Sequence, residues 1–532
     1  MKSHLRTVFG CDPRSLAIFR MALASLILFD VCDWFLHCEQ YFSSSGLLDS
    51  ASAQSVSPHS WSLNYLSDSP WYTRSLLLLL AAACVAFFLG WKTKIAIFTC
   101  WILLASFQTR NPLILISGDS LLRMMLLWAM FIPMDKAWSI DGSKKKGLEM
   151  PDEGKTRLET NWVCTAGTVC LLLQICMMYW CAGFAKLNDT WLSGSALDYV
   201  LRMDVYTRPF GIWLREHDSL TKALSLATPW IEIMVPLLLF SPWRTLTLRV
   251  IVIAILLSFH AGIELALNVG KFGMISLVAW LPFIPPRFWA GTVPAFASGE
   301  HGSNDSFPDP KSESRVFCFS KLNKPAQHYL AFGLLVYVAI WNIATVVDLK
   351  RATTNRCMPA LFYKMGEMTK LSQKFFMFAE PPRHNTRFIF RGKLADDSEI
   401  DLRTSQLVPS QATSLPSDLP MGWVWKKVHR YILSNGTSDA INTSLLSHYT
   451  EHWNNREEKT SPVLSSQLIV FTKPIRLIDP SDAYQTTTLA MWNASPSDAT
   501  TTEIMTEQFE KTLDHLESGF LFPQDEIDGN IE

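Results

Sequence analysis

Long apolar runs dominate the chain up to about residue 348. Nine of them approach the length of a membrane-spanning helix, at about 15–37, 72–90, 93–109, 113–134, 161–186, 222–241, 244–262, 266–285 and 326–348. Several are interrupted by polar residues, so eight or nine spans are expected. A backbone inside a bilayer must satisfy its hydrogen bonds internally. The runs therefore predict a mainly α, polytopic membrane helical bundle over residues 1–348.

The composition agrees with a membrane protein. Of the 532 residues, 49% are hydrophobic and only 18% are charged, which is too few charges for a typical soluble protein of this length. The 20 Trp and 32 Phe residues suit the aromatic belts at membrane surfaces. A net charge of -1 offers no broad basic surface, so no nucleic-acid partner is expected. Membrane lipid is the first partner that the composition predicts.

Lysine and arginine in short loops predict the orientation. Basic residues occur in four segments, namely the N-terminal residues, the 90–94 turn, the 135–160 loop and the 241–250 turn. The loop at 38–71 has acidic residues and no Lys or Arg. Because basic loops stay in the cytoplasm, the N terminus should be cytoplasmic, and residues beyond about 349 should lie outside.

After residue 348 the long apolar runs end, and shorter stretches of alternating apolar and polar residues follow. The stretch "TRFIFRGKLADDSEIDLRT" alternates apolar and polar residues around a turn, and "SSQLIVFTKPIRLI" reads as a further strand. We therefore expect a smaller β-containing extramembrane domain at 349–480. Residues 481–532 are polar and acidic and are expected to form a tail.

Ionisable side chains in the apolar runs gather towards the outer half of the membrane. Lys186 follows 26 residues that contain no Asp, Glu, Lys, Arg or His, and Asp119, His260 and Glu264 fall at a similar depth. Each charge inside a span costs about 2.5–3.5 kcal/mol, so each needs a reason. We interpret the group as an outward-facing polar cavity. Simpler interpretations stay open: Lys186 as a surface anchor, His260 as a helix–helix hydrogen-bonding residue, and Asp119 neutralised by Arg123 four residues later.

Several stretches resemble one family. "DPRSLAIFRMALASLILFD", "YWCAGFAKLNDTWLSGSALDYVLRMDVYTRP" and "FHAGIELALNVGKFGMISLVAWLPFIP" are similar to the opening, the lysine signature and the histidine signature of the vitamin K-dependent gamma-carboxylase-like family, also called the horizontally transferred transmembrane domain (HTTM) family. "FFMFAEPPRHNTRFIFRGKLADDSEIDL" resembles the outward domain of many bacterial members. The resemblance covers about residues 8–480 and indicates a bacterial-type member, which implies a bacterial inner membrane as the location.

The resemblance implies roles for individual residues. Lys186 would be the base that deprotonates a reduced quinone, either vitamin K hydroquinone or a menaquinol-like molecule, with His260 as the second catalytic residue. The expected cavity-lining residues are Asp119, Arg123, Trp191, Glu264 and Asn268. In the animal enzymes the oxygenated cofactor removes a proton from a substrate glutamate, which then captures carbon dioxide. A secreted or membrane peptide or protein is therefore the implied substrate.

Three functions remain open. The first is a carboxylase-like enzyme of the carbon–carbon lyase type, whose lysine must be a free amine in a low-dielectric pocket. The second is another quinone- or lipid-dependent activity on the same scaffold, and the third is a non-enzymatic membrane receptor or assembly protein. The stretch "NPLILISGDSLLR" lacks the second functional histidine of the animal enzymes, and Asp119 falls at or next to its position. This departure favours the second and third functions.

The cysteines predict neither a metal site nor a bridge. Cys164, Cys170, Cys176 and Cys181 share one apolar run, but their spacing does not gather them on one helical face. They are therefore expected to be small buried hydrophobic residues. The animal relatives join their membrane part to their outward domain by a disulfide, which makes a bridge between Cys38 and Cys357 the alternative. Because no sequence feature brings the first and last spans together, two free thiols are predicted.

Overall fold

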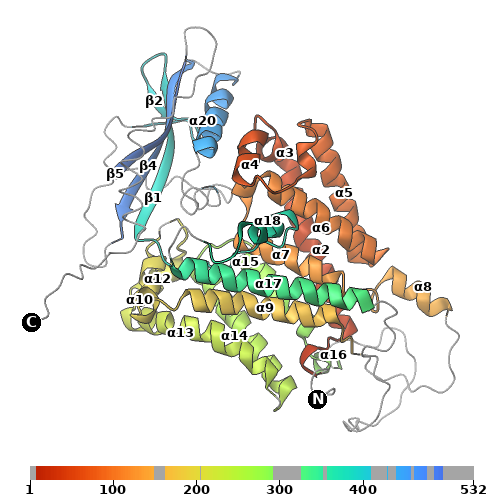
Figure 1. The fold of residues 1–532 in the computed structure, drawn as a ribbon. Helices are drawn as coiled ribbons and strands as arrows, with labels where there is room; N and C mark the ends of the chain where they lie inside the picture. Colours follow the sequence, from red (N-terminus) through yellow and green to blue (C-terminus); the bar gives the residue numbers. More distant parts are fainter. Residues whose placement is uncertain are drawn as a thin grey trace, which may run out of the picture.

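The structure is a computed structural model that describes residues 7–148, 162–203, 205–241, 243–290, 325–351, 356–408, 428, 439–456, 461–475 and 485–494. A helical bundle forms most of it, and an antiparallel sheet with one helix lies at one end (Figure 1). The predicted fold class is therefore confirmed: a mainly α membrane bundle followed by a smaller β-containing unit.

Six helices among the described residues are long and apolar enough to cross a membrane. They are α2 (Pro13–Leu36), α5 (Pro70–Leu89), α9 (Ala166–Ala185), α13 (Asp218–Leu237) with η3 (Leu238–Phe240), α14 (Thr245–Ala266) and α17 (Pro325–Arg351). The other three apolar runs form α6 (Thr93–Arg110), α7 (Ser117–Ala129) and α15 (Phe272–Trp280). The expected eight or nine spans thus become six candidate spans and three helices that are shorter or less apolar.

Short helices make the connections. They are α3 (Cys38–Phe42), α4 (Ser50–Val56), η1 (Leu63–Tyr65), η2 (Pro112–Ile114), α8 (Ile140–Leu148), α10 (Asp189–Leu192), α11 (Ala196–Leu201), α12 (Pro209–Arg215), η4 (Leu281–Phe283), α16 (Pro286–Ala290) and α18 (Ala360–Met368). The turn after α9 is set by Asn188, whose side chain accepts the N–H of Trp191 and so begins α10. This cap ends the long apolar helix directly after Lys186.

At one end of the bundle, the segments rich in basic residues contact other parts of the chain. Arg249, near the start of α14, donates to the carbonyl of Gly10 at 3.1 Å. The backbone N–H groups of Lys92 and Thr93 donate to the Asp141 carboxylate of α8 at 3.1 and 3.0 Å. Helices α8 and α16 lie at the end of the bundle that is away from the sheet (Figure 1). The contacts thus join the basic segments in pairs, the 241–250 turn with the N-terminal residues and the 90–94 turn with α8.

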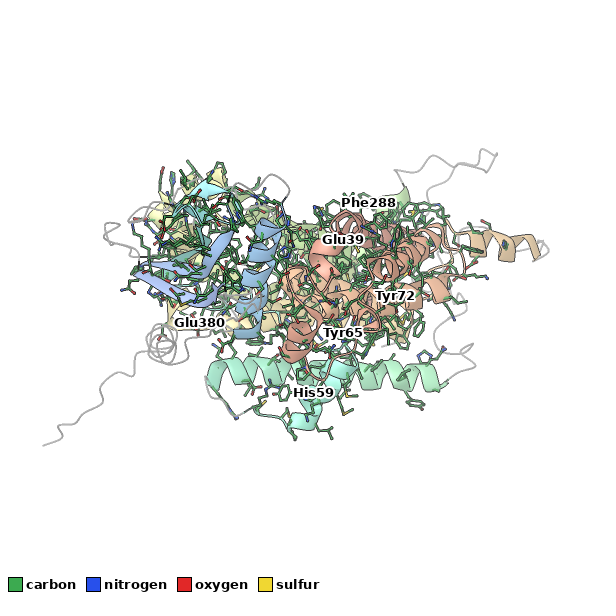
Figure 2. The ribbon with its side chains drawn as sticks, turned by 90° about the horizontal axis from the view of Figure 1, so that it is seen from above. Glu39, His59, Tyr65, Tyr72, Phe288 and Glu380 are labelled. Atoms are coloured by element: carbon green, nitrogen blue, oxygen red, sulfur yellow. The ribbon has the colours of Figure 1, made fainter. Side chains whose placement is uncertain are left out.

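The opposite end carries the acidic first loop and the sheet unit. His448 Nδ1 of α20 (Asp439–Asn454) lies 2.7 Å from the carbonyl oxygen of Ser45, and the N–H of Asp49 donates to Ser444 Oγ at 3.1 Å. The first loop also reaches α18, because Trp61 Nε1 donates to the Met368 carbonyl at 2.8 Å. Seen from above, α17 and α18 lie along one side of the bundle (Figure 2). Which of the two ends faces the cytoplasm stays a prediction from the basic residues.

The sheet has the order β3-β2-β1-β4-β5, with every neighbouring pair antiparallel. Its strands are β1 (His384–Leu394), β2 (Glu399–Asp401), β3 (Gln406–Leu407), β4 (Val463–Pro474) and β5 (Gln485–Asn493). The predicted turn between the first two strands is present, with Asp397 at φ 65°. Because β5 pairs with β4, the sheet continues past residue 480 into the segment that the sequence assigned to the tail.

Cys38 is a buried free thiol and Cys357 is a half-buried free thiol. The prediction of two unbridged cysteines is therefore confirmed.

Candidate functional site

Lys186 lies directly after the last turn of α9 and points into the bundle. The residue is only 4% exposed. Its Nζ donates to the two carboxylate oxygens of Glu232 on α13, at 3.0 and 2.8 Å. The same ammonium lies 5.6 Å from the ring centre of Trp191, a cation–π distance. Lys186 is therefore an internal ion-pair partner and not an anchor at the membrane surface.

A glycine brings the two charged residues together. A Cβ atom added to Gly183, one turn before Lys186, would lie 2.6 Å from the Ile233 side chain and 3.1 Å from Glu232 Cβ. Any larger residue would push α9 away from α13, because small residues permit close helix approach. The "GFAK" stretch thus places the lysine ammonium within reach of a carboxylate on another helix.

His260 of α14 belongs to a buried chain of hydrogen bonds. Its Nε2 lies 2.7 Å from the hydroxyl oxygen of Tyr179, and this oxygen also accepts the Trp280 Nε1–H at 3.2 Å. His260 is 5% exposed. Its Nδ1 is buried and has no hydrogen-bond partner among the residues that the structure describes. One ring nitrogen is thus held by Tyr179, and the other has no partner in the described part of the chain.

A cavity of about 40 Å³ joins the two groups. Its lining is apolar apart from Lys186, Glu232, His260 and Tyr179, and consists of Met178, Tyr179, Ala182, Lys186, Glu232, Phe259, His260, Ile263, Phe272, Phe375 and Met377. A cavity of about 150 Å³ is known to hold benzene. The cavity in its present form therefore has room for a molecule the size of water and not for an aromatic ring.

One wall of the cavity comes from residues 370–379, which we call the strap because they run from α18 across the bundle towards β1. Side chains of three helices, α7, α17 and α10, donate hydrogen bonds to its backbone carbonyls: Arg123 to Lys370 and Ser372, Trp341 to Gln373, Trp191 to Phe378 and Ala379. Asn188, which caps α10, also donates to Ala379 at 2.8 Å. The strap is thus fixed at both ends, and Phe375 and Met377 close the cavity from its middle.

The comparison with known families matches the HTTM domain over residues 10–289. The chain belongs to the HTTM family. It is a multi-pass integral membrane protein, as the family match and the apolar helices together show. No curated protein and no solved structure matches it. The HTTM match includes Lys186, Glu232, His260 and Phe272, whereas the strap lies outside it.

Asp119, predicted at the cavity, belongs to a second buried cluster of this HTTM protein. Lys271 Nζ lies 2.8 Å from Asp119 Oδ1 and also pairs with Asp30 of α2. Asp119 Oδ2 accepts the N–H of Ile116 at 2.7 Å, which begins α7. All three charged residues are buried. The Asp119 carboxylate therefore pairs with Lys271 and not with Lys186. It is not among the groups that line the described cavity.

The remaining predicted site residues lie around the cavity without lining it. Arg123 donates to Gln108 Oε1 at 2.5 Å as well as to the strap, so it is engaged away from Asp119. Glu264 forms a half-exposed ion pair with Arg208 at 2.5 Å. The N–H of Asn268 donates to the Tyr206 carbonyl at 2.7 Å. Of the predicted residues, Lys186 and His260 are the ones that meet at the cavity within the described part of the chain.

Three residues of the site were not predicted from the sequence. Glu232 was visible as a carboxylate deep in an apolar run, which is itself a signal of function or pairing. Tyr179 and Trp280 gave no signal, because aromatic residues are common in membrane helices and their polar atoms do not reveal their partners. In the described segments no group of three or more His, Cys, Asp and Glu residues is placed to hold a metal ion.

Proposed function

We propose that this HTTM protein is a membrane-embedded enzyme that binds a reduced quinone and takes up a proton at Lys186. The observation that supports the proposal is a buried lysine, 2.8 Å from the Glu232 carboxylate, at the wall of an apolar cavity that also presents His260. Buried charges in a membrane are costly and occur mainly where they have a function.

The residues around the cavity fit a quinone in their chemistry. Phe259, Phe272 and Met178 provide apolar walls for a ring, and Lys186 and His260 provide polar groups for its oxygens. At about 40 Å³ the cavity is too small for a ring, so binding requires side chains of its wall, such as Phe375 and Met377, to turn away. When bound, a reduced quinone would supply the electrons of the reaction.

The Lys186–Glu232 pair supplies a proton acceptor. In a low-dielectric interior, an ion pair can become neutral when one proton moves from Lys186 Nζ to the Glu232 carboxylate. The Nζ lone pair is then free to accept a proton from a ligand hydroxyl, while Glu232 keeps the first proton. The pair then carries one positive charge, which stabilises an oxyanion beside Nζ.

We further propose that the reaction is of the carboxylase type and that its substrate is a side chain of a secreted or membrane peptide. The family resemblance of the Lys186 and His260 stretches supports the reaction type. The direct connection of the strap to β1 supports delivery of the substrate from the side that carries the sheet.

A membrane receptor or assembly protein is the second candidate. Both oxygens of Glu232 lie within 3.0 Å of Lys186 Nζ, and a purely structural ion pair would have the same geometry. In this case the lysine would hold α9 against α13, and the sheet unit would bind the partner.

Menaquinol binding and turnover by purified protein in lipid nanodiscs separate the two candidates. We expect saturable quenching of tryptophan fluorescence by menaquinol under argon, and oxidation of bound menaquinol when oxygen and carbon dioxide are admitted. Lys186→Arg should still fold but lose turnover, because arginine stays protonated. Lys393→Arg, at an exposed ion pair 3.0 Å from Asp397, is the matched control. Wild-type protein without saturable binding, or full turnover by Lys186→Arg, would contradict the enzyme proposal.

A further inference from the structure

We propose that His260 binds its ligand as a hydrogen-bond donor through Nδ1–H, and that Tyr179 and Trp280 are positioning residues that fix this tautomer. The ligand of the cavity must then present an acceptor oxygen to His260. This inference rests on the proposed quinone site and states how that site recognises the oxygen of its ligand.

The first step is the role of Trp280. An indole Nε1–H can only donate, so at 3.2 Å from Tyr179 it must donate to the hydroxyl oxygen. One lone pair of the Tyr179 oxygen is thereby occupied. The hydroxyl hydrogen of Tyr179 remains to be placed.

The second step is the direction of the bond between Tyr179 and His260. Tyr179 is 1% exposed, so its hydroxyl hydrogen needs an acceptor inside the protein. His260 Nε2, at 2.7 Å, is the acceptor that the structure offers. The opposite direction, from Nε2–H to the hydroxyl oxygen, would leave the Tyr179 hydrogen buried and unpaired. His260 Nε2 therefore accepts.

The third step fixes the other ring nitrogen. A neutral imidazole carries one hydrogen, so an accepting Nε2 puts that hydrogen on Nδ1. A doubly protonated ring is excluded because Nε2 would then have to donate, and because the Lys186 ammonium lies at the same cavity. His260 is therefore neutral and presents an Nδ1–H.

The fourth step identifies what Nδ1–H can bind. Nδ1 is buried without a partner among the described residues, and His260 lines the cavity. The Lys186 ammonium cannot accept a hydrogen bond, and no bond joins Nδ1 to the Glu232 carboxylate, which pairs with Lys186. The imidazole also contacts the rings of Phe259 and Phe272, which offer no acceptor oxygen or nitrogen. The acceptor must therefore come from the ligand.

A ligand bound at His260 Nδ1–H would also lie beside the Lys186 ammonium, which lines the same cavity. Lys186 Nζ and His260 Nδ1 both favour oxygens that carry free lone pairs or negative charge, such as a quinone carbonyl or a deprotonated quinol hydroxyl. Loss of the Nδ1–H donor is expected to weaken the binding of oxidised menaquinone, whose carbonyl oxygens only accept, by about tenfold.

The tautomer can be measured directly in the protein without any ligand. Nitrogen-15 NMR of histidine-labelled protein in nanodiscs distinguishes the two tautomers, and the His260 signals are assigned by their loss in His260→Gln. We expect wild-type His260 to show a protonated Nδ1 and an unprotonated Nε2. We expect Tyr179→Phe to shift the ring towards protonated Nε2. A wild-type spectrum with protonated Nε2 overturns the proposal, even if Tyr179→Phe does not fold.

Binding of oxidised menaquinone is the second arm. Tyr179→Phe should bind it about tenfold more weakly, whereas Tyr337→Phe should bind it like wild type. Tyr337 is a matched control because its hydroxyl donates to the Phe362 carbonyl at 2.6 Å, outside the cavity. If wild-type protein shows the predicted tautomer but binds no menaquinone, the proposed function fails and the His260 assignment stands. If wild type binds menaquinone and Tyr179→Phe changes neither signal nor affinity, the assignment fails and the proposed function stands.

Discussion

Removing one partner of the Lys186–Glu232 pair should destabilise the protein far more than removing both. The two side chains are 6% and 7% exposed, so either charge left alone would be buried without compensation. Breaking a buried pair in this way costs about 3–5 kcal/mol, whereas replacing both residues by apolar residues of similar volume is about neutral or stabilising. The test therefore compares Lys186→Met, Glu232→Met and the double variant.

The assay is reversible unfolding in mixed micelles as the fraction of SDS rises, which yields an apparent free energy of unfolding. Each single variant should lose about 3–5 kcal/mol and the double variant should recover most of it. Arg74 and Glu39 form a matched exposed pair at 2.9 Å, with side chains 30% and 64% exposed. Replacing either of them by methionine should change stability by less than about 1 kcal/mol.

Two results would refute this reasoning. Single variants within about 1 kcal/mol of wild type would mean that the pair is solvated. A double variant that is stable and still oxidises menaquinol would mean that Lys186 is not the proton acceptor. The double variant matters most, because it removes the amine while preserving the fold and thus separates the enzyme from a receptor with a structural ion pair.

Three further predictions concern the strap and the orientation. Met377→Ala should enlarge the cavity and speed menaquinone binding in stopped-flow fluorescence; an unchanged rate would show that the strap does not limit entry. Burial, with Arg123 nearby, lowers the pKa of Lys370 from its ordinary 10.5 to about 7. The folded protein therefore binds fewer protons than the unfolded chain between these values, so its stability should rise with pH across this window, and Lys370→Met should flatten the rise in thermal unfolding at pH 7 and 9. Reporter fusions after residues 150 and 360 should report opposite sides of the membrane, and the same side for both would exclude the predicted topology.

The parts of the fold that were predictable are those with a strong local pattern. Apolar length predicted the bundle, and alternation around the turn near Asp397 predicted the first two strands, because both patterns reflect which side of an element is buried. The strand β5 was missed because its sequence, "QTTTLAMWN", lies in a polar, acidic surrounding. Its pairing with β4 is a long-range contact that composition does not reveal.

The sequence predicted how deep the site residues lie in the membrane, but not which way their side chains point. Topology placed Lys186, His260 and Asp119 at a similar depth in the membrane, and this was the basis for assigning them to one cavity. Depth does not determine which way a side chain points around its helix axis. Asp119 faces Lys271, which also pairs with Asp30, whereas Lys186 faces Glu232. The rotation of each helix is set by packing, as where Gly183 lets α9 approach α13.

The strap explains why two predicted cavity-lining residues, Trp191 and Arg123, do not line the cavity. Trp191 and Arg123 donate to strap carbonyls near its two ends, and each such bond contributes about 0.5–1.5 kcal/mol, more for the charged donor. Lifting the whole strap would break these bonds together, whereas turning Phe375 and Met377 breaks none of them. A ring should therefore enter by side-chain rotation beneath a fixed backbone.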